Sequence, residues 1–169
     1  MTLVRGPFDI KWGANTLIDV SSITSEYTLD SSEYKTIDNR VYTIDGAQKA
    51  SVKIVLLASD VAALAVVLPQ YHVVNGGVMS SGETVNEANG AIDTVAANCD
   101  QSIIYNDLDI TSCGNPGQTF RLKNARTRID SMDFADNAIR TITIQFLGEP
   151  AAGIANMQFF KEGTITTIS

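Results

Sequence analysis

The sequence predicts a mainly β protein in which many strands accompany one α-helix. Three observations predict this class: several runs alternate apolar and polar residues with a period of two, those runs are rich in Val, Ile and Thr, and one Ala- and Leu-rich segment ends at Pro69. The chain has 169 residues, of which 44% are hydrophobic and 18% are charged. This length and composition supply enough apolar material for one hydrophobic core.

The alternating runs give the expected strands. Residues 8–12 and 16–20 flank Gly13-Ala14-Asn15 and predict a β-hairpin. Residues 49–57 become apolar on both faces, which predicts a central strand covered on both sides. In residues 119–130 the alternation changes phase, which predicts a β-bulge near Asn124. Further extended runs are expected at residues 23–29, 41–46, 102–112 and 139–147.

The expected helix comprises residues 61–68, where Ser59 and Asp60 can cap the N-terminus and Pro69 ends the pattern. Because this segment is apolar on nearly all sides, we expect the chain or a neighbouring subunit to enclose it. Residues 70–101 are rich in Gly, Ser and Asn and predict a long, loop-rich crossing with one or two short strands. Loops of this length are usually functional.

Each candidate motif for catalysis or metal binding in the sequence is incomplete, so we expect neither an enzyme nor a bound cofactor or metal. His72 is the only histidine and no Gly-x-Ser-x-Gly motif accompanies it, so we interpret it as a surface or packing residue. The run from Asp107 begins like a calcium loop but lacks its Gly and its closing Glu. Cys99 and Cys113 are too far apart for a Cys-x-x-Cys pair. Free thiols are the preferred interpretation, and a disulfide is the alternative.

The net charge of −7 and the pI near 4.5 argue against a role in binding nucleic acid, since such affinity comes largely from Lys and Arg. No apolar run approaches the ~20 residues that a membrane span needs. The N-terminus lacks the apolar segment of a secretory signal. We therefore expect a protein without a membrane span that is made in a cytoplasm.

Three segments together resemble the tail tube proteins of tailed bacteriophages: residues 5–13 (RGPFDIKWG), 57–64 (LASDVAAL) and 141–150 (TITIQFLGEP). The similarity covers the order of elements from about residue 3 to residue 150 and includes no diagnostic motif. It implies a β-sandwich or barrel flanked by one helix. It also implies that six copies close into a ring and that hexameric rings stack into a hollow tube, which carries DNA from the capsid to the host cell.

The resemblance implies a structural protein of the virion tail, made in the cytoplasm of the bacterial host. Its partners would be further copies of itself and the sheath, terminator, baseplate or tape-measure proteins, while DNA would pass through without specific binding. A tail terminator, or a related inner-tube protein of a contractile injection system, is the alternative. An Ig-like binding module is a third hypothesis, but it needs an exposed aromatic site, and Trp12 lies in the apolar phase of a strand.

We interpret residues 1–150 as the tail-tube-like β domain and residues 151–169 as an extended C-terminal tail docked on a neighbouring subunit. The polar segment 30–40 is expected to project and to contact the adjacent ring through Glu33, Tyr34, Lys35, Asp38 and Arg40. Asp107 and Asp109 share a strand face and are candidates for an acidic lining of the lumen, with the outer wall as the alternative. Candidates for pairing between subunits are Arg121, Lys123, Arg126, Arg128, Phe159 and Phe160, and a solvated sheet face is the alternative for the four basic residues.

Overall fold

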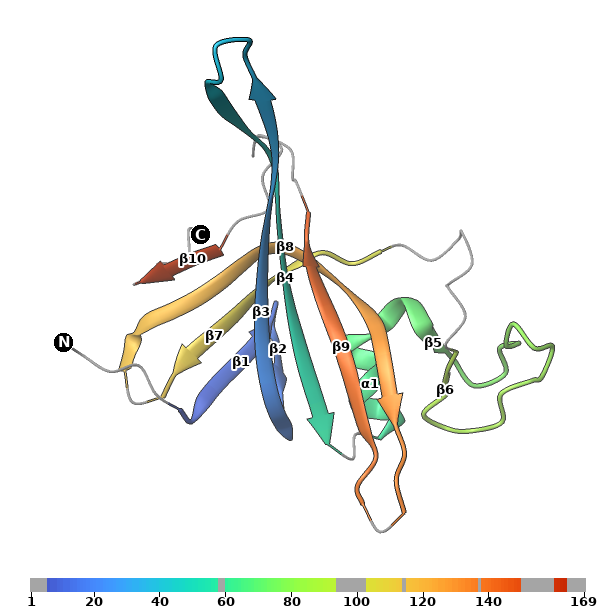
Figure 1. Ribbon diagram of the computed structural model, residues 1–169. Coiled ribbons are helices and arrows are strands. Elements are labelled where there is room, and N and C mark those ends of the chain that lie inside the picture. The colour runs from blue at the N-terminus through green and yellow to red at the C-terminus, as the bar shows by residue number, and fades with distance from the viewer. Residues whose placement is uncertain are drawn as a thin grey trace.

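A computed structural model describes residues 6–57, 60–93, 103–113, 115–136, 138–149 and 160–163. Its main feature is one large antiparallel sheet, with a second sheet of two short strands (Figure 1). The elements in chain order are β1 (Phe8–Trp12), β2 (Asn15–Leu17), β3 (Val20–Lys35), β4 (Val41–Leu57), α1 (Val61–Val67), the 3-10 turn η1 (Pro69–Tyr71), β5 (His72–Val73), β6 (Ala91–Ile92), β7 (Asn106–Ser112), β8 (Asn115–Asp133), β9 (Thr141–Gly148) and β10 (Phe160–Gly163).

The order of strands in the large sheet is β2-β1-β7-β8-β9-β4-β3, with β10 added on β8. Strands β2 and β3 are therefore the two ends of the sheet, although Leu17 ends one and Val20 begins the other. Asp19 turns the corner between them with a φ of 56°, and its carbonyl accepts a hydrogen bond of 2.8 Å from Leu57 N. Because so short a corner joins the two ends, the sheet has to curl into an incompletely closed barrel. The predicted hairpin is confirmed, because β1 and β2 pair antiparallel, but its second strand ends at Leu17 instead of residue 20, since the corner begins there.

The inner face of the curled sheet forms the core. Trp12 meets Phe146 edge to face with ring centroids 6.2 Å apart, and its Nε1 donates to the carbonyl of Ala125 over 3.1 Å. Strand β4 contributes Val52, Ile54 and Leu56 to this core. Its other face, which carries Lys53, Val55 and Leu57, is only half-buried. The prediction that this strand is covered on both faces is therefore wrong, although other strands do flank it on both edges.

Helix α1 begins and ends as predicted. The Asp60 carboxylate accepts a hydrogen bond of 2.8 Å from Ala63 N, which caps the first turn, and Pro69 follows the last turn. Leu64 and Val67 are buried and join the core of the sheet. Val66 is 45% exposed, so the single chain does not enclose the helix on all sides.

The predicted β-bulge is confirmed at Asn124. Between β7 and β8 the register moves from Asn106 opposite Ala125 to Leu108 opposite Leu122, and Asn124 has a φ of 49°. The loop-rich crossing is confirmed as far as residue 93, because residues 72–93 contain only β5, β6 and the isolated bridge between Val78 and Thr84, while residues 94–101 lie outside the described residues.

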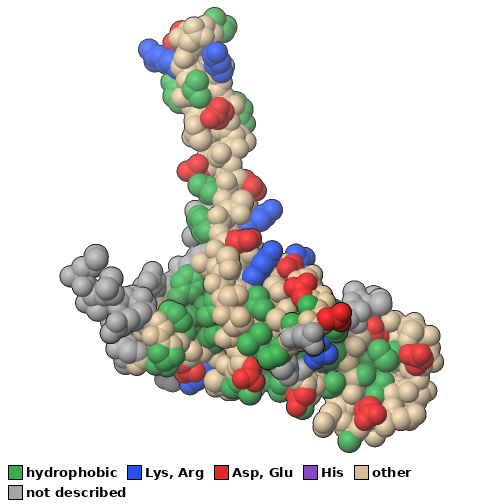
Figure 2. Space-filling view, turned by 60° about the horizontal axis from the view of Figure 1, so that its bottom comes forward, with side chains coloured by type: hydrophobic (Ala, Val, Ile, Leu, Met, Phe, Trp, Pro, Cys, Tyr) green, Lys and Arg blue, Asp and Glu red, His purple; other side chains and the backbone are tan. Residues whose placement is uncertain are grey.

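The polar segment after residue 29 differs from its predicted form. Instead of a long loop, β3 and β4 continue and pair as far as Lys35 and Val41, and a tight turn at residues 36–40 joins them. Asn39 supplies the left-handed conformation that this turn needs, with a φ of 63°. The two strands project well beyond the barrel as a narrow hairpin, here called the arm and defined as residues 24–46 (Figures 1 and 2). The predicted projection is therefore present, and it is longer than residues 30–40.

Candidate assembly surfaces

The described residues on the arm are exposed, and many of them are large and apolar. Register separates the tip into two faces, because side chains opposite each other in antiparallel strands lie on the same face. Tyr34 lies opposite Tyr42 and Ser32 opposite Ile44, which gives one face two tyrosines and an isoleucine. Glu33 and Lys35 alternate with these residues and lie on the other face. The exposed large hydrophobic residues of the arm are Tyr27, Leu29, Tyr34, Ile37, Val41, Tyr42 and Ile44.

All five residues predicted for contact with an adjacent ring lie near the tip of the arm and are exposed. Two of them, Asp38 and Arg40, already interact: Arg40 Nε lies 3.1 Å from Asp38 Oδ2, and Thr36 Oγ1 donates to the same carboxylate. These two residues therefore support the turn. The prediction missed the apolar face, although the alternation at residues 41–44 (VYTI) in a projecting segment is a signal that could have shown it.

The outer face of the sheet carries the predicted acidic pair, and cations of the same chain neutralise it. Arg121 makes a bidentate interaction with Asp109, with Nε and Nη2 at 2.5 and 2.7 Å from the two carboxylate oxygens. This hydrogen bonding raises the pKa of Arg121 further above its ordinary value. Lys123 Nζ lies 3.0 Å from Asp107 Oδ2, and the other oxygen of Asp107 accepts a hydrogen bond from Asn124 N over 2.9 Å.

Neighbouring pairs continue this pattern on the same face. Arg126 is paired with Glu149, Arg128 Nε donates to Gln145 Oε1 over 2.7 Å, and Lys53 lies 3.7 Å from Asp130. The basic residues expected to pair with another subunit thus meet partners in their own chain. The reason is register, since Asp109 and Arg121 lie directly opposite each other on β7 and β8.

The same register makes the face around the predicted acidic pair mixed in charge. Asp107 and Asp109 are half-buried in a face of mixed charge, and their side chains are 32% and 26% exposed. A face on which carboxylates alternate with Lys and Arg repels phosphates far less than a purely acidic face. The location of these residues in a lumen stays a prediction.

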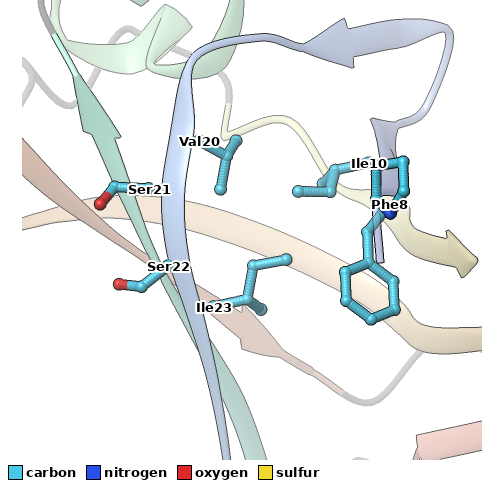
Figure 3. Close-up of a pocket in the computed structure, with 7 residues that line it drawn as sticks. Phe8, Ile10, Val20, Ser21, Ser22 and Ile23 are labelled. Atoms are coloured by element: carbon cyan, nitrogen blue, oxygen red, sulfur yellow. The ribbon is translucent and has the colours of Figure 1, made fainter. Parts of the chain in front are cut away.

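A groove of about 440 Å³ lies where the curled sheet fails to close (Figure 3). Phe8 and Ile10 on β1 face Val20 and Ile23 on β3 across it, and Pro7, Ser21 and Ser22 complete its lining. Strand β3 ends the sheet, so its outer edge offers backbone groups to a further strand. Apolar side chains beside a strand edge are characteristic of an interaction surface.

The C-terminal strand is placed differently from the expectation. Strand β10 pairs antiparallel with β8 of its own chain, with Phe160 opposite Leu122 and Gly163 opposite Thr119. Phe159 lies outside the described residues, and so does Cys99. Cys113 is an exposed free thiol. His72 is half-buried, and its Nε2 donates to the carbonyl of Asn89 over 2.8 Å, in agreement with a packing role.

Neither the protein-family models nor the curated proteins gave a match to this sequence. Solved structures of similar fold do exist. The tube-terminating cap of the anti-feeding prophage is 13% identical, the alignment covers 98% of this chain and 96% of that chain, and the TM-score is 0.54. The sheath/tube terminator of the extracellular contractile injection system PVC is 14% identical over 88% of this chain and 96% of that one, with a TM-score of 0.51. A chain of the PVC sheath–tube complex reaches a TM-score of 0.49 at 12% identity, over 98% and 92% of the two chains.

At these identities the likeness establishes the fold. The chain has the mainly β, helix-flanked fold of these cap and terminator proteins, and the predicted fold class is confirmed. The described part of the chain contains no helix that is long and apolar enough to cross a membrane.

Proposed function

We propose that the protein is a structural component of a phage-like tail or contractile injection system, and that it terminates a tube as a ring of identical subunits. The observation that carries this proposal is the likeness to a tube-terminating cap over nearly the whole of both chains. The likeness to a sheath/tube terminator points the same way. The role first inferred from the sequence, that of the tube subunit itself, is the second candidate, and its support is the resemblance of the three segments described above.

The exposed surfaces suit a subunit that works through contacts with other chains. The arm presents Tyr34, Tyr42 and Ile44 to solvent, and the groove between β1 and β3 leaves Phe8 44% exposed. Exposed apolar surface of this extent is characteristic of contact with other chains. In this proposal the groove and the edge of β3 meet the neighbouring subunit within a ring of six, while the arm meets the next ring or the tube.

Partners and cargo follow from the same proposal. The ring would contact tube and sheath proteins, and DNA or another cargo would pass without specific binding. The mixed-charge outer face then serves as a contact surface, since alternating Lys, Arg, Asp and Glu can match a complementary pattern on a partner. No catalytic step belongs to this role.

Electron microscopy of the purified chain separates the two candidates. A terminator assembles into single rings that do not stack, because its outward face has no contact surface for a further ring. A tube subunit forms long filaments. We expect rings of one layer by negative staining and a matching mass by light scattering. If the chain alone forms long filaments, the tube subunit becomes the assigned function in place of the terminator. A monomer at every concentration would overturn both.

A further inference from the structure

Strand β8 is the longest strand of the sheet, and its two edges are unequally covered. On one edge it pairs with β7 between Asn115 and Ala125. On the other edge β9 pairs with it only from Ala125 to Asp133. The first part of this second edge is covered by β10, which lies opposite residues 119–122. An uncovered edge here would be a template for pairing, so a strand at this position matters for the whole sheet.

The connection between β9 and β10 is longer than its path on β8 requires. Both strands run antiparallel to β8 on the same edge, and therefore in the same direction. Gly148 lies opposite Ala125 and Phe160 opposite Leu122, so only Lys123 and Asn124 separate the two partners on β8. That gap is roughly 10 Å, since a strand advances about 3.3 Å per residue. Residues 149–159, by contrast, can span roughly 35 Å when extended.

We propose that β10 is an exchange strand: in the assembled ring it leaves its own β8 and pairs with residues 119–122 of β8 in a neighbouring copy. The backbone hydrogen bonds are the same in either place, because both edges belong to the same sequence. In an isolated chain, the connection of residues 149–159 is a tether that keeps β10 close to β8 of the same chain and so favours pairing there. In a ring, the long tether reaches the adjacent edge, and the subunits become linked one to the next. This inference rests on the ring assembly of the proposed function.

Cysteine cross-linking tests the exchange. Thr119 and Gly163 lie directly opposite each other, a position at which cysteines can form a disulfide. In a Cys99→Ser, Cys113→Ser background, one chain carries Thr119→Cys and the other Gly163→Cys, and the two are co-expressed and oxidised. Exchange gives a covalent dimer on a non-reducing gel. The matched control combines Gly163→Cys with Thr143→Cys on β9, away from this edge, and should give no dimer.

The double variant, with both cysteines in one chain, gives the complementary result. Exchange produces a ladder of linked chains, whereas pairing within the chain produces a monomer of altered mobility. Single-layer rings by electron microscopy together with that monomer would overturn the exchange and leave the proposed function intact. If no rings form at all, both inferences fail together.

Deletion of residues 154–169 adds a readout that does not depend on disulfides. The remaining chain should keep its β-sheet signal in circular dichroism, since the described core residues precede residue 150. The rings should disappear in sedimentation. Rings that form as well from the shortened chain as from the full chain would also overturn the exchange.

Discussion

Single side chains join the helix to the sheet. Thr127 is buried on β8, where its hydroxyl donates to the carbonyl of Val67 over 2.7 Å and its own carbonyl accepts a hydrogen bond from the Gln70 amide. The Val67 carbonyl is one of those that the end of a helix leaves without a partner in the helix. The Thr127 hydroxyl therefore satisfies a backbone group that would otherwise be buried unpaired.

We expect Thr127→Val to lower the free energy of unfolding by about 1–3 kcal/mol, because the shape is kept while a buried carbonyl loses its donor. Thr127→Ser, which keeps the hydroxyl, should cost less. Thr143→Val on the half-exposed face of β9 is the control and should change stability by less than about 0.5 kcal/mol. Urea denaturation measures all three, and equal losses for Thr127→Val and Thr143→Val would contradict this role.

Tyr105 gives the protein a predictable response to high pH. Its hydroxyl donates to Glu149 over 3.0 Å, and burial and then this hydrogen bond raise the pKa of Tyr105 above its ordinary value of 10.0. A pKa that is higher in the folded than in the unfolded chain contributes stability below pH 10, and this contribution is lost as the pH rises through the folded value.

The stability advantage of the natural chain over a Tyr105→Phe variant should therefore shrink as the pH rises above 10. Chemical denaturation at pH 9 and at pH 10.5 measures this difference. A gap between the natural chain and Tyr105→Phe that stays constant over this range would contradict the assigned hydrogen bond.

At the scale of elements, the sequence predicted the features that depend on local chemistry. A capping Asp60, a terminating Pro69 and a phase change at Asn124 act within a few residues, so each was found where the structure has it. The length of the arm was not predicted, because residues 30–39 are polar and resemble a loop. Residues 30–35 nevertheless extend β3, because residues 31–35 pair with residues 41–45 of β4, and a polar composition does not reveal this pairing.

The two faces of the arm should behave differently in assembly. Tyr34→Ser, Tyr42→Ser and Ile44→Ser together remove the apolar face, whereas Glu33→Ser and Lys35→Ser change the opposite face. All five residues are exposed, so both variants should fold with nearly unchanged stability. We expect both variants to form rings, and the rings of the apolar variant alone to lose their contact with the tube, as co-sedimentation of the rings with assembled tube protein would show. If the charged variant loses this contact with the tube and the apolar variant keeps it, the charged contact first predicted from the sequence would be correct.

At the scale of the molecule, alternation predicted which side chains face inward, but not which strands are neighbours. Residues 16–20 and 23–29 are adjacent in sequence and read naturally as consecutive strands, yet the corner at Asp19 sends them to opposite ends of the sheet. The internal pairing of Asp109 with Arg121 was missed for the same reason, since it depends on which strands pair and in which register. Pairing between distant segments is determined by the whole fold, so the local pattern of a single sequence does not predict it.

The pairing of β1 with β7 has a consequence for synthesis. Phe8 lies opposite Ser112, so the first strand waits for its main partner while the ribosome makes the intervening chain, roughly 5–20 seconds at 5–20 residues per second. Until then β1 has only β2, and a two-stranded hairpin is marginally stable in water. The arm meanwhile has both of its strands by Leu57. A nascent chain arrested before Ser112 would therefore display an open barrel, with Ile10 and Trp12 available to chaperones or to other unfinished copies on the same message.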